Sequence, residues 1–256
     1  MCSDVEARIG CAAKKAKNLL GQLGPLVWAL HARHQCVGDA AEVIAKDPER
    51  SIQVAPGISD KVRQQAVADI STLVAGASGN RAMLSSANLR EVINRSVVVY
   101  AVAGLEDFMD QAAQPVYRHL KGKKRWPRHF TGMCCLVEQQ FRAINKPFAC
   151  YREVSHLAQV RHSIIHNDGK VDHDFRDKVA KERLEFRLSD DGNSVIWAPG
   201  CSQSPTQDWD GKPVSIAIEC FILPMLRHAQ EFVREAERSL LVVLPGPSSL
   251  TQTQIR

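Results

Sequence analysis

The stretch RHSIIHNDGKVDHDF, residues 161–175, joins the end of an apolar helical pattern to a polar turn. Apolar residues before and within it recur at helical spacing and define one face of an ideal helix: Leu157, Val160, Ile164 and Ile165. The Asn-Asp-Gly that follows is typical of a left-handed helix cap. The stretch therefore predicts an amphipathic helix whose last turn contains His166.

Three titratable side chains lie on this predicted helix. Arg161 falls inside the apolar face, where a guanidinium has to be paired, extended to solvent or directed into a cleft. His162 and His166 lie together beyond the edge of that face, one turn apart. The free carbonyls of a helix C-terminus favour a cation, so His166 is placed to carry a proton near neutral pH. Such a histidine beside a permanent cation suits chemistry on a phosphodiester.

Helical spacing predicts that most of the chain is helical. The expected helices cover residues 4–46, 59–77, 82–114, 133–144, 148–166 and 214–241. A break is expected at Gly24-Pro25, a helix end before Pro115 and a kink at Pro224. Residues 47–57 are rich in turn formers, and the tail 245–256 has nothing to bury and is predicted to be disordered.

The pattern changes to strand-like runs after residue 183. Residues 184–188 and 194–197 are predicted to be two short strands, joined by Asp190-Asp191-Gly192-Asn193, a favourable hairpin turn. The expected fold class is therefore mainly α, a helical bundle with one small β-hairpin inserted before the last helix.

The composition is that of an ordinary globular protein. Of 256 residues, 45% are hydrophobic and 24% charged, and the formal net charge of +5 leans towards polyanionic partners. The eight cysteines form no CxxC pair and no zinc-site spacing. The sequence has no signal-peptide pattern and no apolar run long enough to span a membrane. We therefore expect a soluble, cytoplasmic protein that does not associate with membranes.

The motif Arg161-His-Ser-Ile-Ile-His166 resembles the R-x4-6-H signature of the HEPN superfamily. Members often carry Asn, Asp or His directly after the arginine, and His162 stands in that place. Asn167, Gly169 and the loop VDHDF are similar to members that continue with N-x-G-x-V-D.

The wider arrangement is similar as well. YAVAGLEDFMDQ, residues 100–111, resembles the early helix of the family with its inward glutamate, here Glu106. The hairpin and last helix resemble one branch of the superfamily, in which a short β-insertion precedes the final helix. The resemblance implies a HEPN-type bundle over residues 86–244. Residues 1–85 are then an α-helical N-terminal segment of unknown role, and residues 245–256 a disordered tail.

The resemblance implies a metal-independent endoribonuclease that needs no cofactor. The 2′-hydroxyl of RNA attacks the adjacent phosphate, which leaves a 2′,3′-cyclic phosphate and a 5′-hydroxyl. His166 is then the general acid or base, and Arg161 holds the phosphate and stabilises its developing charge. His162 is the polar helper. Glu106 and Asn167 are supporting residues, and Glu106 is expected to pair with Arg161.

Proteins of this kind act as bacterial toxins or phage-defence effectors, so an antitoxin or regulatory partner is expected by the same analogy. The family pairs through its motif helix, which implies a homodimer. Arg161 and His166 are about 140° apart on an ideal helix. A site shared across the dimer would bring both side chains to one phosphate.

A basic segment precedes the motif helix. Residues 111–137 contain no acidic side chain, and the basic residues cluster around Trp126 and Phe130. This combination suits an RNA backbone with stacking on exposed bases. The candidate RNA-binding residues are Lys121, Lys123, Lys124, Arg125, Trp126 and Arg128. A solvated basic loop is the alternative.

A non-catalytic HEPN scaffold that binds RNA, a nucleotide or a partner protein is the alternative function. A metal site is not favoured: His162 and His166 have the spacing of HExxH, but Ser163 stands in place of its glutamate. The loop VDHDF is interpreted as a solvated acidic turn that caps the next helix. Glycine-rich phosphate loops and GxSxG elbows do not occur in the sequence, which gives ATPase and esterase activities no support.

Overall fold

The computed structural model describes residues 2–46, 86–120, 122, 124–149, 151–201 and 203–244. They belong to two compact units, Met1–Pro25 with Asn94–Arg256, and Leu26–Ile93. The candidate site lies in the first unit, to which the packing described below is confined. Outside the described residues lie the predicted helix 59–77, the connector 47–57, the domain boundary at residue 85 and the tail 245–256.

The described chain is mainly helical, as the sequence predicted. Its α-helices are α1 Cys2–Lys46, α4 Ser86–Phe108, α5 Gln114–His119, α6 Phe130–Ala143, α7 Arg152–Asn167, α8 His173–Glu182 and α9 Leu223–Val242. Among the described helices, none has a stretch long and apolar enough to cross a membrane.

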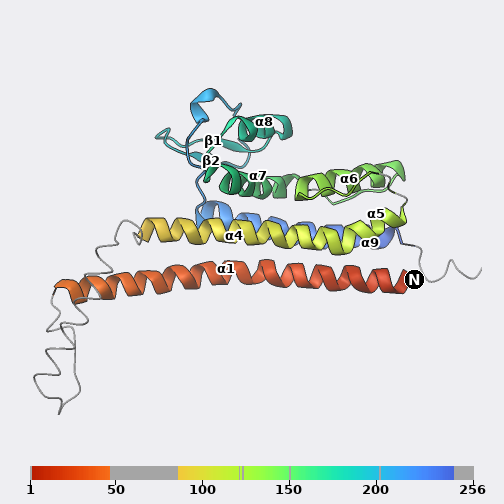
Figure 1. Cartoon of the computed structure of the whole chain (residues 1–256), viewed down its shortest axis with the longest axis horizontal. Coiled ribbons are helices and arrows are strands. Elements are labelled where there is room, and N and C mark those ends of the chain that lie inside the picture. The colour runs from red at the N-terminus through yellow and green to blue at the C-terminus, as the bar shows by residue number, and fades with distance from the viewer. Residues whose placement is uncertain are drawn as a thin grey trace, which may run out of the picture. The chain divides into compact units, whose positions relative to one another are not determined.

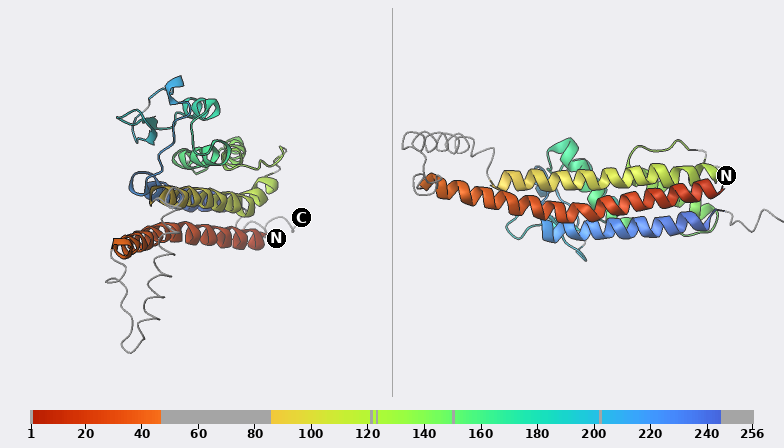
Figure 2. Two further views of the ribbon diagram at one scale, coloured as in Figure 1. Left: turned by 60° about the vertical axis from the view of Figure 1, so that its left-hand side comes forward. Right: turned by 90° about the horizontal axis from the view of Figure 1, so that it is seen from below.

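Three layers of helices form the first unit (Figures 1 and 2). The beginning of α1 lies against one face of the pair α4 and α9, and α6 and α7 lie against the other face. Residues of α1 buried at intervals of three and four form its packing stripe: Ile9, Ala13, Ala16, Leu20 and Leu23. Ion pairs join α1 to both neighbours, from Lys15 to Asp107 at 2.9 Å and from Lys17 to Glu237 at 2.8 Å.

Proline interrupts the helices less than expected. α1 is continuous through Pro25, so the predicted break is wrong: one missing N–H leaves the rest of the hydrogen-bond ladder in place. α4 also continues, through a π-helical turn Met109–Ala113 and then α5, which contains Pro115 in its first turn. The helix continues past Pro115, which comes just after the π-helical turn, so the predicted end before Pro115 is wrong as well.

The last helix begins later than residue 214. Val214 N donates to Gly169 O at 2.8 Å and Ser215 N to Val195 O at 2.8 Å, so this segment pairs as extended chain. A π-helical turn, Ile218–Ile222, follows, and Pro224 then lies in the first turn of α9. The predicted start failed because these long-range hydrogen bonds outweigh the helical spacing of the apolar residues.

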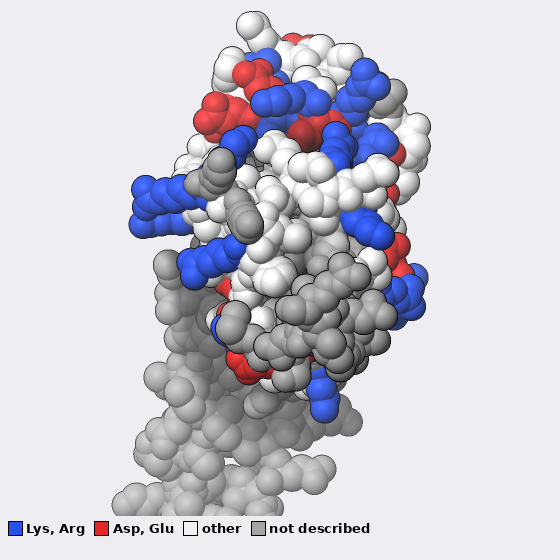
Figure 3. All heavy atoms as spheres, turned by 90° about the vertical axis from the view of Figure 1, so that its right-hand side faces the viewer, with Lys and Arg blue, Asp and Glu red and all other residues white. Residues whose placement is uncertain are grey.

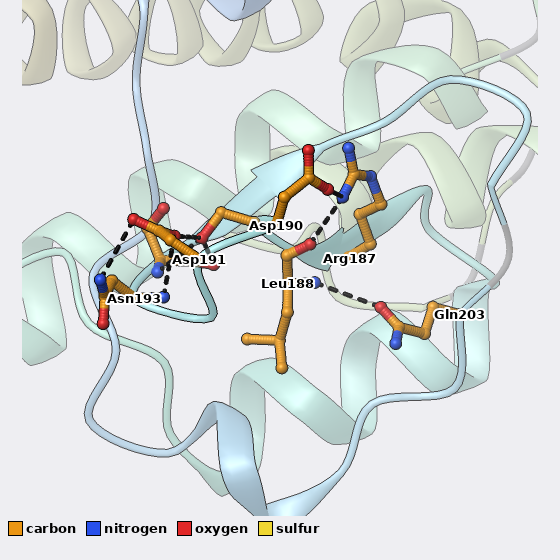
Figure 4. Close-up of polar contacts among 8 residues, drawn as sticks. Arg187, Leu188, Asp190, Asp191, Asn193 and Gln203 are labelled. Atoms are coloured by element: carbon orange, nitrogen blue, oxygen red, sulfur yellow. Dashed lines mark hydrogen bonds and ion pairs between the residues drawn. The ribbon is translucent and has the colours of Figure 1, made fainter.

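The predicted hairpin is present. Strands β1 Phe186–Leu188 and β2 Val195–Trp197 pair antiparallel, with Arg187 opposite Ile196. Polar side chains organise its turn (Figure 4). Asp191 accepts from Asn193 N at 3.1 Å, and the Arg187 guanidinium donates to Asp190 at 2.7 Å. Hydrogen bonds lower the pKa of the Asp191 carboxyl, and the one donated by Ser189 Oγ has the greatest effect.

Candidate functional site

The motif helix α7 ends where the sequence predicted. Asn167 is its last residue, and Asp168 and Gly169 follow with φ of 52° and 74°. The positive φ of Gly169 favours glycine here, and a Cβ would lie 2.9 Å from a nitrogen of the Arg95 guanidinium, which would have to shift. The same guanidinium bonds Asp168 at 2.5 Å, which lowers the pKa of that carboxyl. The turn is therefore held from α4 as well as by its own backbone.

Two side chains of the motif helix form hydrogen bonds to the segment that follows this turn. Ser163 is buried and donates to Lys170 O at 2.8 Å, while the Asn167 amide donates to the Asp172 carboxylate. Asp172 also accepts from Phe175 N at 2.7 Å and so caps α8. The prediction that VDHDF caps the next helix is confirmed, although Phe175 is fully buried rather than part of a solvated turn.

An open pocket of about 470 Å³ lies beside the motif. We call it the motif pocket. It is lined from α4 by Val102 and Glu106, from the start of α6 by His129, Phe130 and Thr131, from α7 by Ala158, Gln159, Arg161, His162 and His166, and from α8 by Asp174 and Lys178.

The motif pocket gathers four of the five predicted catalytic and supporting residues: Glu106, Arg161, His162 and His166. The fifth, Asn167, holds the turn. The angle of about 140° between Arg161 and His166 does not separate them, because they lie at the two edges of the α7 face that lines the pocket, with His162 between them. Within one chain, both side chains reach the same cavity.

The Arg161 guanidinium has unused hydrogen-bonding capacity. Its Nη2 lies 3.8 Å from Glu106 Oε2, which makes the predicted ion pair but is too long for a hydrogen bond. Its Nε is buried without an acceptor among the described residues. Glu106 in turn accepts from Phe130 N at 3.2 Å, at the start of α6. Arg161 is thus placed by a carboxylate that leaves most of its donors available.

The two motif histidines are in contact. The ring centroids of His162 and His166 are 4.4 Å apart, with the planes tilted by 44°. Burial and the neighbouring His166 lower the pKa of His162, against the opposing effect of Asp172 and Asp174. The lowered pKa favours the neutral form of His162.

Gln159 is the site residue that sequence reasoning missed. It is only 6% exposed, it lines the motif pocket, and its amide Nε2 has no hydrogen-bond partner among the described residues. It precedes His162 by three residues and shares its helix face, a spacing that could have indicated it. Such an amide is costly to bury unless a ligand completes its hydrogen bonds.

The buried face of α7 is rotated by roughly a quarter turn from the predicted apolar face. Leu157 and Val160 are buried as expected, but Ile165 is 47% exposed. Polar residues take its place: Ser163 bonds Lys170 O, and His156 bonds both Glu153 O, at 3.0 Å, and Glu185 N, at 2.8 Å. Hydrogen bonds made inside the protein allowed these residues to be buried.

The predicted RNA-binding residues that the structure describes in the basic segment do not line the motif pocket, although His129, Phe130 and Thr131 of the same segment do. Lys121 and Lys123 lie outside the described residues, and none of Lys124, Arg125, Trp126 and Arg128 lines the pocket. Arg125 and Arg128 are exposed.

The two aromatic side chains of the basic segment are already engaged. Trp126 Nε1 donates to Asp110 at 2.5 Å, and its ring packs on Tyr117 with centroids 5.7 Å apart. Phe130 is buried against Phe232, so the expectation that it stacks on bases is wrong: it belongs to the core.

Figure 3 views the end of the molecule at which α1 begins. Basic side chains project there at several separate places around an uncharged surface, and acidic side chains lie between some of them. Among the described residues, the basic side chains on this face do not form one continuous patch.

Comparison with known proteins gives no relative. No protein-family model matches the chain, and neither a curated protein nor a solved structure matches it. Across the part of the chain that the structure describes, no three His, Cys, Asp or Glu side chains gather in a group that could hold a metal ion. The chemistry of the motif pocket therefore has to be argued from its own residues.

Replacing the unpartnered amide should stabilise the fold. Gln159→Met keeps the length of the side chain and removes the buried polar group, so the free energy of unfolding is expected to rise by about 1 kcal/mol. Ser163→Ala is the matched control, because it removes a buried hydroxyl whose hydrogen bond is made, and it should lower stability. Urea unfolding measures both, and a loss of stability in Gln159→Met would show that the amide has a protein partner.

Stability should fall at acidic pH. Burial lowers the pKa of His156 and of His162, so the unfolded chain binds more protons below about pH 6.5. The stabilising contribution is complete above that pH and is lost as the pH falls towards the folded-state pKa values. In His156→Gln, urea unfolding between about pH 5 and 8 should show a flatter acid dependence. His119→Gln, on the exposed end of α5, should keep the full dependence, and equal slopes in both variants would contradict this account.

Proposed function

We propose that this chain is a metal-independent endoribonuclease of the HEPN type. The observation that carries the proposal is the convergence of Arg161, His162 and His166 on one open pocket within a single chain. A cation with unused donors beside two imidazoles is what the cleavage of a phosphodiester requires. The R-x4-H spacing and the capped end of α7 are consistent with the same proposal.

In the proposed reaction, Arg161 binds the non-bridging oxygens of the scissile phosphate. Its terminal Nη donors can do so, because Glu106 lies 3.8 Å from Nη2 and does not accept a close hydrogen bond. The 2′-hydroxyl attacks phosphorus, the bond to the 5′-oxygen breaks, and a 2′,3′-cyclic phosphate and a 5′-hydroxyl result. His166 transfers a proton in this step, and His162 assists at the same phosphate.

The partners follow from the same proposal. The substrate is RNA, whose backbone would be held by the exposed Arg125 and Arg128 as well as by Arg161. We propose, by the same family resemblance, a homodimer through α7, in which Ile165, 47% exposed on the motif helix, would lie at the interface. We further propose a cytoplasmic toxin or phage-defence effector, restrained by an antitoxin or another regulatory partner.

Total RNA incubated with the purified chain in EDTA tests the proposal. Cleavage that leaves cyclic-phosphate ends is expected, and it should fall by about 10²–10⁴ in His166→Ala and in Arg161→Ala. The matched controls are His119→Ala, at the exposed end of α5, and Arg234→Ala, whose side chain pairs with Glu231 on α9. Both control positions lie outside the motif pocket, so both variants should cleave like the unchanged protein.

Two results would count against the ribonuclease. If the unchanged protein binds RNA without cutting it, and His166→Ala binds equally well, the chain is a binding module. If cleavage disappears on chelation, a metal takes part and the proposed roles of the histidines do not hold.

A further inference from the structure

The contact between His162 and His166 restricts how many protons the two rings can hold. Two imidazolium ions with ring centroids 4.4 Å apart repel each other, so the first proton makes the second harder to add. Over a range of pH the pair therefore carries one added proton, so that one ring is an imidazolium and the other is neutral. One ring is then an acid and the other a base, in one pocket and on one helix.

The surroundings decide which ring holds the proton. His166 is exposed in the last turn of α7, at the helix end that favours a cation. His162 is less exposed, and burial together with the charge on His166 lowers its pKa. The other charged or titratable groups that line the pocket or act on His162 are Glu106, His129, Arg161, Asp172, Asp174 and Lys178. Asp174 in α8 and Asp172 at its cap raise the pKa of His162, but the net shift of that pKa is still downward.

We propose that His162 is the general base, which takes the proton from the attacking 2′-hydroxyl, and that His166 is the general acid, which protonates the departing 5′-oxygen. This inference rests on the proposed ribonuclease activity and gives His162 a chemical role rather than that of a helper. The bond from the 2′-oxygen to phosphorus forms while the bond from phosphorus to the 5′-oxygen breaks. His162 gains one proton, His166 loses one, and exchange with water restores the pair.

A single histidine serves this reaction poorly. In an in-line displacement the attacking and leaving oxygens lie on opposite sides of phosphorus, so one ring cannot reach both in one step. Two rings one helical turn apart supply an acid and a base without movement of the backbone. Arg161, at the edge of the same helix face, remains available for the charge on the non-bridging oxygens.

A substrate that needs no general acid separates the two roles. We would use a short RNA containing the cleavage site found in total RNA, synthesised with either oxygen or a bridging sulfur at the 5′ leaving position. A thiolate leaves without protonation, so His166→Ala should lose about 10²–10⁴ on the oxygen substrate and recover most of the loss on the sulfur substrate. His162→Ala should be slow on both, because the 2′-hydroxyl has to lose its proton whichever leaving group is present.

The pH dependence gives a readout that a structural role would not move. On the oxygen substrate the rate of the unchanged protein should rise and then fall with pH, as the base loses its proton and then the acid loses its own. The sulfur substrate should remove the falling limb and keep the rising one. His162→Gln, checked by thermal unfolding, repeats the test with a polar side chain in place of the ring, and His119→Ala is the unaffected control.

Each other outcome overturns the assignment. Recovery of His162→Ala rather than His166→Ala on the sulfur substrate would reverse the roles. Full activity of a folded His162→Ala would leave His162 without a chemical role, although the ribonuclease proposal would survive. Absence of cleavage by the unchanged protein on both substrates would refute the ribonuclease itself, and this inference with it.

Discussion

The left-handed turn at Asp168 and Gly169 is the constraint on which the site depends. It ends α7 at Asn167, so His166 lies exposed in the last turn of the helix, near the carbonyls of its C-terminus. Hydrogen bonds from Ser163 and Asn167 fix the direction in which the chain leaves. α8 then starts at Asp172, close enough for Asp174 and Lys178 to line the motif pocket. A different turn would remove one wall of that pocket.

The pocket contains polar groups that the protein itself does not satisfy. Arg161 Nε and Gln159 Nε2 are both buried without an acceptor among the described residues. A fold optimised for stability would pair such groups or replace them, since each one costs free energy comparable to a lost hydrogen bond. Further buried polar atoms without a partner among the described residues lie outside the motif pocket, in Asn94, Trp197 and Trp209, so these groups alone do not identify a ligand.

The local parts of this fold could be predicted from the sequence, and the long-range parts could not. The end of α7 and the β1–β2 hairpin follow from caps and turn residues. The pairing of Glu106 with Arg161 is long-range, and the family resemblance, not a local pattern, gave that expectation. The exposure of Ile165 and the burial of Ser163 do not, because they depend on hydrogen-bond acceptors that become available only after folding. The extended segment before α9 escaped prediction for the same reason: its partners, Gly169 and Val195, are distant in the sequence.

Three histidines on α7 show why residue type and helix position alone do not identify a catalytic group. His156 has a hydrogen bond at each ring nitrogen: Nδ1 must donate to Glu153 O, and Nε2 must accept from Glu185 N. Its neutral tautomer is therefore fixed, and a proton at Nε2 would break the second bond. His162 and His166 lack such backbone partners among the described residues and contact each other instead. Burial, which lowers its pKa, and these two hydrogen bonds make His156 a structural residue, whereas the motif pair has the geometry that the proposed proton transfers need.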